Sequence, residues 1–152
     1  MKYYLTIFLL VVASVVSGAE PAVRTTMSLN DDWQFYFIDD DISDASYITL
    51  PHTWSDGKQE CCYATANYVR SFMVPATMRG KRLFLRFGGV QSVAEVFING
   101  RYVGEHRGAY TAFTLEITDK VRYGESNTLM VVVSNNTRSD VLPISTDQNL
   151  YG

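Results

Sequence analysis

Aromatic and acidic residues in the expected loops are the side chains best suited to chemistry in this chain of 152 residues. A sugar presents an apolar ring face and a rim of hydroxyl groups, which an aromatic platform and Asp or Asn acceptors can recognise. The candidates are the loop aromatics and two acceptors close to the last of them: Trp54, Tyr63, Tyr110, Tyr151, Asp147 and Asn149. These residue types permit sugar binding. Composition alone supports this weakly, because most aromatics should be core residues, Trp33 among them, and Trp54 is expected to pack under a loop.

The sequence shows no complete catalytic centre. Neither His52 nor His106 lies in the sequence context of a nucleophile elbow, so a Ser-His-Asp triad is not indicated. Gly88-Gly89 is not followed by a phosphate-loop pattern. No spacing of carboxylates singles out a pair for glycoside chemistry. We therefore expect no catalytic residue within this chain.

Metal and redox chemistry are not indicated either. Cys61 and Cys62 are adjacent and could form only a strained bridge, so we expect two unpaired thiols. The acidic run Asp39–Asp41 lacks the spacing of a calcium-binding EF-hand loop and reads as a solvated loop. The two histidines have no Cys or His at ligand spacing. The expectation is no metal and no cofactor.

Composition limits the class of protein. The net charge of −3 and the pI near 5.3 argue against nucleic-acid binding, which usually requires a basic stripe. The 47% content of hydrophobic residues is enough for one core. A complete barrel enzyme of roughly 250 residues would not fit in this length.

The first residues have the pattern of a secretory signal peptide. Lys2 is followed by an apolar run, 3–16, and by the small residues Ser17-Gly18-Ala19. This pattern predicts a signal peptide over 1–19, a short linker over 20–28 and a secreted or periplasmic protein without a membrane anchor after cleavage. A single membrane anchor is the alternative, but the apolar run is short for a hydrocarbon core of ~30 Å.

Strands must position the candidate residues, and the stretch Leu83–Val133 shows them most clearly. Four apolar segments, 83–87, 93–98, 113–117 and 129–133, are separated by turn signals, and alternate residues of each segment should lie on opposite faces of a strand. The pair Asn99-Gly100 lies between two apolar runs and predicts a tight hairpin, because both central residues of a type I′ turn need positive φ. Further strands are expected over 33–37, 47–50 and 68–74. The pattern predicts an all-β jelly roll or β-sandwich.

Several motifs together resemble the N-terminal sugar-binding domain of glycoside hydrolase family 2. The resemblance runs from about Leu29 to Gly152 and rests on the segments Leu50–Trp54, Tyr68–Pro75, Lys81–Val90, Ala94–Gly100, Val103–Phe113 and Asp119–Gly124. Ala109 and Ala112 depart from the family pattern, which usually has Gly and Pro there. This resemblance implies a galactose-binding-domain-like jelly roll over 29–152.

The resemblance also implies partner domains and a reaction. Members of this family place an immunoglobulin-like domain and a (β/α)₈ barrel after the jelly roll, and the barrel carries the two catalytic glutamates of a retaining glycosidase. The family usually continues from the position of Gly152 into a last strand. We therefore expect a truncated domain that lacks its last strand and does not hydrolyse glycosides alone.

Asp147 is the residue that the resemblance marks for substrate binding. Family members carry an acidic residue at the matching position, and it hydrogen-bonds sugar hydroxyls in the barrel's pocket. A carboxylate suits this role because it can accept two charge-assisted hydrogen bonds. Asn149 is the competing candidate. His52, His106 and Tyr110 match positions that we interpret as structural.

The expected function is that of the N-terminal module of a secreted hydrolase of β-linked sugars, with galactose the expected sugar and carbohydrate the expected partner. One alternative is a stand-alone carbohydrate-binding module. Another is a purely structural sandwich that touches no sugar. Asn135-Asn136-Thr137 is also an N-glycosylation sequon, which would matter only in a eukaryotic secretory pathway.

Overall fold

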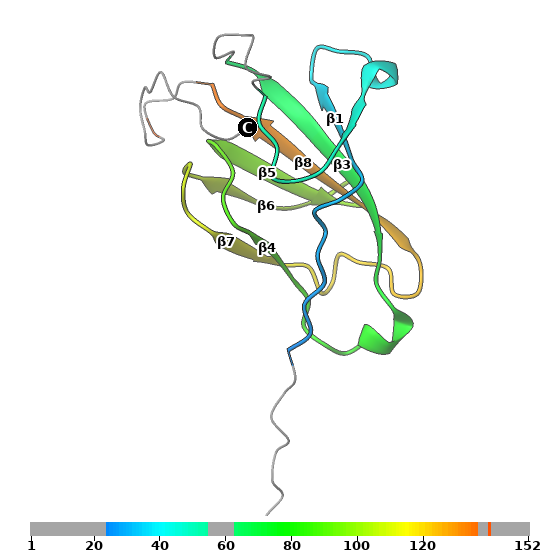
Figure 1. Cartoon of the computed structure of the whole chain (residues 1–152). Helices are drawn as coiled ribbons and strands as arrows, with labels where there is room; N and C mark the ends of the chain where they lie inside the picture. Colours follow the sequence, from blue (N-terminus) through cyan, green and yellow to red (C-terminus); the bar gives the residue numbers. More distant parts are fainter. Residues whose placement is uncertain (1–23, 55–62, 137–139, 141–152) are drawn as a thin grey trace, which may run out of the picture.

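The alternating segments fold into two β-sheets in the computed structural model, which describes residues 24–54, 63–136 and 140 (Figure 1). The larger sheet has six strands in the order β2-β1-β3-β8-β5-β6. Its strands are β1 (Trp33–Phe37), β2 (Ser46–Ile48), β3 (Thr65–Met73), β5 (Val93–Ile98), β6 (Arg101–Arg107) and β8 (Ser126–Ser134). The smaller sheet pairs β4 (Phe84–Phe87) with β7 (Phe113–Glu116). All these strand pairs are antiparallel.

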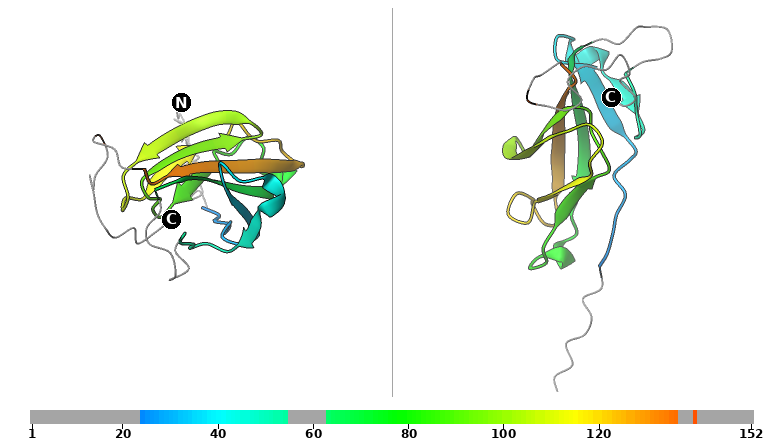
Figure 2. Two further views of the ribbon diagram at one scale, coloured as in Figure 1. Left: turned by 90° about the horizontal axis from the view of Figure 1, so that it is seen from above. Right: turned by 90° about the vertical axis from the view of Figure 1, so that its left-hand side faces the viewer.

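Helical structure in the described part of the chain is limited to single turns, η1 (Ile42–Asp44) and η2 (Ala76–Met78). Asp41 caps the first of these by accepting a hydrogen bond from the Ser43 N–H at 3.0 Å, and this bond lowers the pKa of the Asp41 carboxyl. Figure 2 shows the ribbon from two further directions, in which strands make up nearly all of the coloured regular structure. The prediction of an all-β jelly-roll sandwich is confirmed.

The core lies between the two sheets, where the alternation predicted from sequence holds. On β8, Leu129, Val131 and Val133 are buried, with exposed fractions of 1%, 3% and 3%. The small sheet follows the same rule, since Leu85 is buried while Phe84 points outward and is 48% exposed. The central strands β3, β5 and β8 therefore present an apolar face to the core.

The two sheets approach closely at β6. A Cβ atom built on Gly104 would lie 3.0 Å from Cδ2 of Leu115 on β7. Nearby, the His106 ring of β6 stacks on Phe113 of β7 at 4.2 Å between centroids, and Phe113 stacks on Phe87 of β4 at 4.6 Å. This column of three rings joins the sheets, and the missing side chain of Gly104 leaves space for Leu115.

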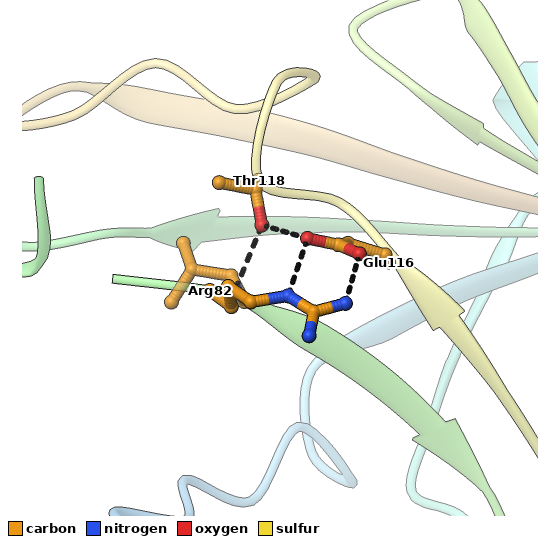
Figure 3. A network of polar contacts seen from close by, with 4 residues as sticks. Arg82, Glu116 and Thr118 are labelled. Carbon is orange, nitrogen blue, oxygen red and sulfur yellow. Dashed lines mark hydrogen bonds and ion pairs between the residues drawn. The ribbon is translucent and has the colours of Figure 1, made fainter. Parts of the chain in front are cut away.

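A polar cluster fixes the pairing of β4 with β7 at one end (Figure 3). Arg82 donates two hydrogen bonds to Glu116, of 3.1 and 2.7 Å, and Thr118 donates to the same carboxylate at 2.9 Å. Thr118 also accepts from the Leu83 N–H at 3.0 Å. The bonds from Arg82 and Thr118 hold the pKa of Glu116 below its usual value. Because Arg82 and Glu116 are exposed, this cluster sets register more than it adds stability.

The predicted hairpin is confirmed, and one predicted strand is shorter than expected. Asn99 and Gly100 have φ values of 52° and 74° and connect β5 to β6, as a type I′ turn requires. The strand expected over 47–50 ends at Ile48, because Leu50 donates its N–H to the Asn30 carbonyl outside the ladder, at 2.7 Å. Residues 1–23, which include the start of the linker, and the region after Asp140 lie outside the described residues, so the expected signal peptide and missing strand stay predictions.

Substitution on β8 should separate core residues from surface residues. We expect Leu129→Ala to lower the free energy of unfolding by about 2–5 kcal/mol, because it leaves a cavity between the sheets. Thr128→Ala, the matched control on the exposed face next to it, should change this free energy by less than about 1 kcal/mol. Chemical denaturation followed by circular dichroism measures both. Equal losses for the two variants would contradict the assignment of faces.

Candidate functional site

The sequence candidates Asp147, Asn149 and Tyr151 lie outside the described residues, as do Cys61 and Cys62. The structure therefore describes the base from which the segment carrying Asp147 departs. This base is one end of the sandwich, which we call the loop end. It contains the start of β3, the end of β8, the start of β5 and the end of β6, because Ser134 pairs with both Thr65 and Val93, and Val93 pairs with Arg107.

Asn135 holds the exit from β8 in place. Its side-chain Oδ1 accepts a hydrogen bond from the Ala64 N–H at 2.8 Å, and its own N–H donates to the Ala64 carbonyl at 3.2 Å. Asn136 then donates to the hydroxyls of Ser134 at 3.0 Å and Thr65 at 3.3 Å. These bonds continue the β3–β8 pairing beyond the last strand residue. They fix the direction in which the chain leaves the sheet.

The bonding of Asn135 also bears on the sequon. The residue is only 5% exposed, and its carboxamide is committed to Ala64. An asparagine must present its side-chain nitrogen to an enzyme before it can be glycosylated. The buried carboxamide therefore argues against use of this sequon in the folded domain.

Arg107 adds a charged contact at the loop end. Its guanidinium donates to Glu105 at 2.9 Å and also contacts the carboxylate of Asp140. Asp140 is the last residue that the structure describes. The contact fixes a point on the chain seven positions before Asp147.

Aromatic residues packed against the core hold the loop that follows β2 in place. Trp54 donates its indole N–H to the hydroxyl of Tyr68 at 2.8 Å, and Nδ1 of His52 lies 3.0 Å from the same oxygen. Phe35 packs on both His52 and Tyr68, with ring centroids 4.7 and 5.1 Å away. Phe37 meets Trp54 edge-to-face at 5.5 Å. These contacts attach the loop to the inner face of β1 and β3.

The protonation states follow from burial. Burial lowers the pKa of His52 below its ordinary value of 6.5, and it raises the pKa of Tyr68 to about 12. Both groups are therefore neutral at pH 7. Nδ1 of a neutral His52 can accept a hydrogen bond from the Tyr68 hydroxyl, while the Tyr68 oxygen accepts a hydrogen bond from the indole N–H of Trp54. This chain of donors satisfies all three polar groups.

The loop aromatics divide into packing residues and exposed residues. Trp33 is 2% exposed, and Trp54 packs against the core and is bound to Tyr68, as the sequence analysis expected. Tyr63 and Tyr110 are 51% and 54% exposed. Both belong to the loop end, Tyr63 just before β3 and Tyr110 just after β6. Of the described candidates, these two are the most exposed to solvent.

The remaining histidine has a structural role, as expected. Nε2 of His106 lies 2.9 Å from the Thr111 hydroxyl, which closes the turn between β6 and β7. Within 24–54, 63–136 and 140, no group of three or more His, Cys, Asp or Glu residues could hold a metal ion. In the same residues, no helix has the length and apolar character to cross a membrane.

Sequence reasoning missed Tyr68 as the residue to which the loop is bound. Alternation puts Tyr68 on the same side of a strand as Arg70 and Phe72, but alternation does not reveal which distant groups meet a hydroxyl. His52 and Trp54 lie 16 and 14 positions away in sequence. A polar aromatic among buried aliphatic residues was the available indication, since a buried tyrosine usually needs a partner for its hydroxyl.

Comparison with known protein families shows to which family this domain belongs. The family model described as "Glycosyl hydrolases family 2, sugar binding domain" matches residues 19–152. The chain belongs to glycosyl hydrolase family 2. The sequence-based resemblance is thereby confirmed.

Relatives within family 2 carry two kinds of name. The chain is 43% identical over 136 residues to a β-glucuronidase of Bacteroides fragilis, with 86% of this chain and 20% of that protein covered. It is 32% identical over 134 residues to a β-galactosidase of Thermoanaerobacter pseudethanolicus, with 79% of this chain and 18% of that protein covered. The chain thus spans about a fifth of the length of these relatives.

A solved family 2 structure supports the fold directly. The crystal structure of a Bacteroides uniformis β-glucuronidase superposes with a TM-score of 0.72 at 35% identity. The match covers 83% of this chain and 16% of that chain. The sandwich described above is therefore the fold of a family 2 N-terminal domain.

The burial of His52 predicts a pH-dependent stability. The unfolded chain takes up a proton on this histidine near pH 6.5, whereas the folded chain does so only at lower pH. The stability is therefore fully present above pH 6.5 and is lost as the pH falls through the folded-state pKa. We expect the melting temperature to fall between about pH 7 and about pH 5. The variant His52→Asn, whose carboxamide can still accept from Tyr68, should flatten this fall. Circular dichroism melts at both pH values test it, and an unchanged slope in the variant would contradict the assignment.

Proposed function

We propose that this chain is the N-terminal module of a secreted hydrolase of β-linked glycosides. The single observation that carries the proposal is the family 2 model, which matches residues 19–152. In this proposal the module contributes no catalytic group, because the expected glutamates belong to a downstream barrel. Its role is to hold the segment carrying Asp147 beside the sugar that the barrel binds.

The anchored loop end supports this role. A substrate-contacting side chain must be held close to its productive position, because small displacements cost binding and rate. Here the exit from β8 is fixed by Asn135 and Asn136, and Asp140 is bound by Arg107. Only a short segment then separates Asp140 from Asp147.

The terminal sugar is the finer part of the proposal. Sequence motifs led us to expect galactose, and one relative above is named a β-galactosidase. The relative with 43% identity is named a β-glucuronidase. We therefore propose that the parent hydrolase removes a terminal β-linked glucuronic acid or galactose, and turnover of nitrophenyl β-glucuronide and nitrophenyl β-galactoside by the longer enzyme distinguishes the two.

The isolated chain should show no turnover of nitrophenyl β-glucuronide or nitrophenyl β-galactoside. The physical reason is that the proposed reaction needs a pair of positioned carboxyl groups that lie in the downstream barrel. Release of nitrophenol is followed by absorbance. Turnover that disappears in Asp147→Ala would overturn the proposal, because it would place the catalytic centre within this chain.

Within the longer enzyme, Asp147→Ala should lower kcat/KM by roughly 10- to 100-fold, since it removes a charge-assisted hydrogen bond to the sugar. Asn149→Ala is the matched variant, because it removes the competing candidate two positions away. A loss confined to Asn149→Ala would transfer the role to that residue. If neither variant lowers kcat/KM, the segment does not contact the substrate.

The family description as a sugar-binding domain favours one second candidate, a module that binds glycan without a catalytic partner. Calorimetric titration of the isolated chain with galactose, glucuronic acid and short β-galactans distinguishes it. Saturable heat would support such a module. Flat traces would favour a role that depends on the neighbouring domains.

A further inference from the structure

The turn between β5 and β6 contains the only Asn-Gly pair of the sequence, Asn99-Gly100. An asparagine followed by glycine is chemically labile in a flexible chain. Glycine has no side chain to shield its backbone nitrogen, so this nitrogen can reach the carboxamide carbon of the preceding asparagine. Whether hydrogen bonds hold the Asn99 carboxamide in place therefore decides whether this turn can react.

The fold binds that carboxamide on both sides. Its Nδ2 donates to Oδ1 of Asn127 at 2.9 Å and to the Lys120 carbonyl at 3.2 Å. Its Oδ1 accepts from the Thr128 N–H at 3.1 Å. The Asn99 N–H also donates to the Thr128 carbonyl, at 2.9 Å. The side chain thus connects the hairpin to the segment that enters β8.

Asn127 is itself rigidly held. It is 1% exposed, and its carboxamide accepts from the Arg122 N–H at 2.7 Å. Its Nδ2 donates to the carbonyls of Arg122 at 2.9 Å and Glu125 at 3.2 Å. With the bond from Asn99, every hydrogen-bonding group of this buried side chain has a partner. Asn127 therefore offers Asn99 a fixed acceptor that cannot easily move away.

We propose that Asn99 is a latent deamidation site, protected in the folded domain by Asn127 and modified when the chain unfolds. In the reaction, the Gly100 nitrogen forms a bond to Cγ of Asn99, the bond from Cγ to Nδ2 breaks, and the Gly100 proton leaves with that nitrogen as ammonia. Water then opens the cyclic imide at either carbonyl, giving aspartate or isoaspartate. Ring closure requires the carboxamide to leave Asn127, Lys120 and Thr128.

The product would not fit the folded turn. An aspartate has no N–H to donate, and its carboxylate would face the Asn127 Oδ1 and the Lys120 carbonyl, both of which are acceptors. An isoaspartate would add a backbone atom to a turn that has two residues between paired positions Ile98 and Arg101. Modification during one unfolding event would therefore hinder refolding to this structure.

Ageing the full chain in mildly alkaline buffer tests the proposal. Peptide mass spectrometry should find Asn99 modified on the order of a hundredfold more slowly in the folded chain than in the urea-unfolded chain, because several hydrogen bonds must break first. Equal rates in the two states would overturn it.

A pair of destabilised variants separates local protection from general stability. Asn127→Ala removes the acceptor, whereas Val133→Ala removes buried volume near the opposite end of β8. Urea concentrations are chosen so that both variants have the same unfolded fraction. Asn99 should then react at least about threefold faster in Asn127→Ala, since only this variant lacks the local bond. Equal rates would mean that Asn127 gives no local protection.

If Asn127→Ala does not fold, the wild-type chain can be used to test whether the fold protects Asn99. The deamidation rate measured across sub-denaturing urea should follow the small population of opened chains. A rate that does not change with urea up to the unfolding transition would contradict protection by the fold.

Discussion

The burial of one apolar face of the central strands between the two sheets is the constraint on which the rest of this domain depends. Strands β3, β5 and β8 lie at the centre of the larger sheet, and their inner residues include Ala66, Ala94, Val96 and Ile98, each with no exposed surface. Burial of apolar surface is the main favourable term in folding. Because side chains alternate, this burial also fixes which residues face solvent and how the strands register. The loops take their positions from the ends of these strands.

Polar side chains then fix the loops at both ends of the sandwich. On the inner face of β3, Tyr68 binds His52 and Trp54, and at the loop end Asn135 binds Ala64. At the other end, Asn127 connects the hairpin to the entry of β8. In each case a buried polar group finds its partners in a loop, which avoids the cost of an unpaired polar atom. The loops are consequently positioned with the precision of the sheets that hold them.

The fold was largely predictable from sequence because its determinants are local. Alternation revealed the strand faces, and Asn99-Gly100 revealed the hairpin, since positive φ at both residues is a local requirement. The bond of Leu50 to Asn30, which shortens β2, depends on a residue 20 positions away and leaves no local pattern. The roles of Tyr68 and Asn127 were not predictable for the same reason, because their partners come together only when distant segments pack. The candidate site was predictable only as a set of residue types and through resemblance to a family.

In the proposed function, this domain contributes to catalysis without supplying a catalytic residue. In the proposal, the sandwich positions the segment that follows Asp140, and that segment presents Asp147 to a sugar bound elsewhere. Specificity for galactose or glucuronic acid would then depend on the downstream domain together with this one contact.

The most direct test of this account is a crystal structure of the longer polypeptide with a monosaccharide bound in its active site. We predict that residues 33–134 keep the sandwich described here, and that a carboxylate oxygen of Asp147 lies within about 2.5–3.0 Å of a sugar hydroxyl. A bound sugar that touches no residue of 24–152 would contradict the account.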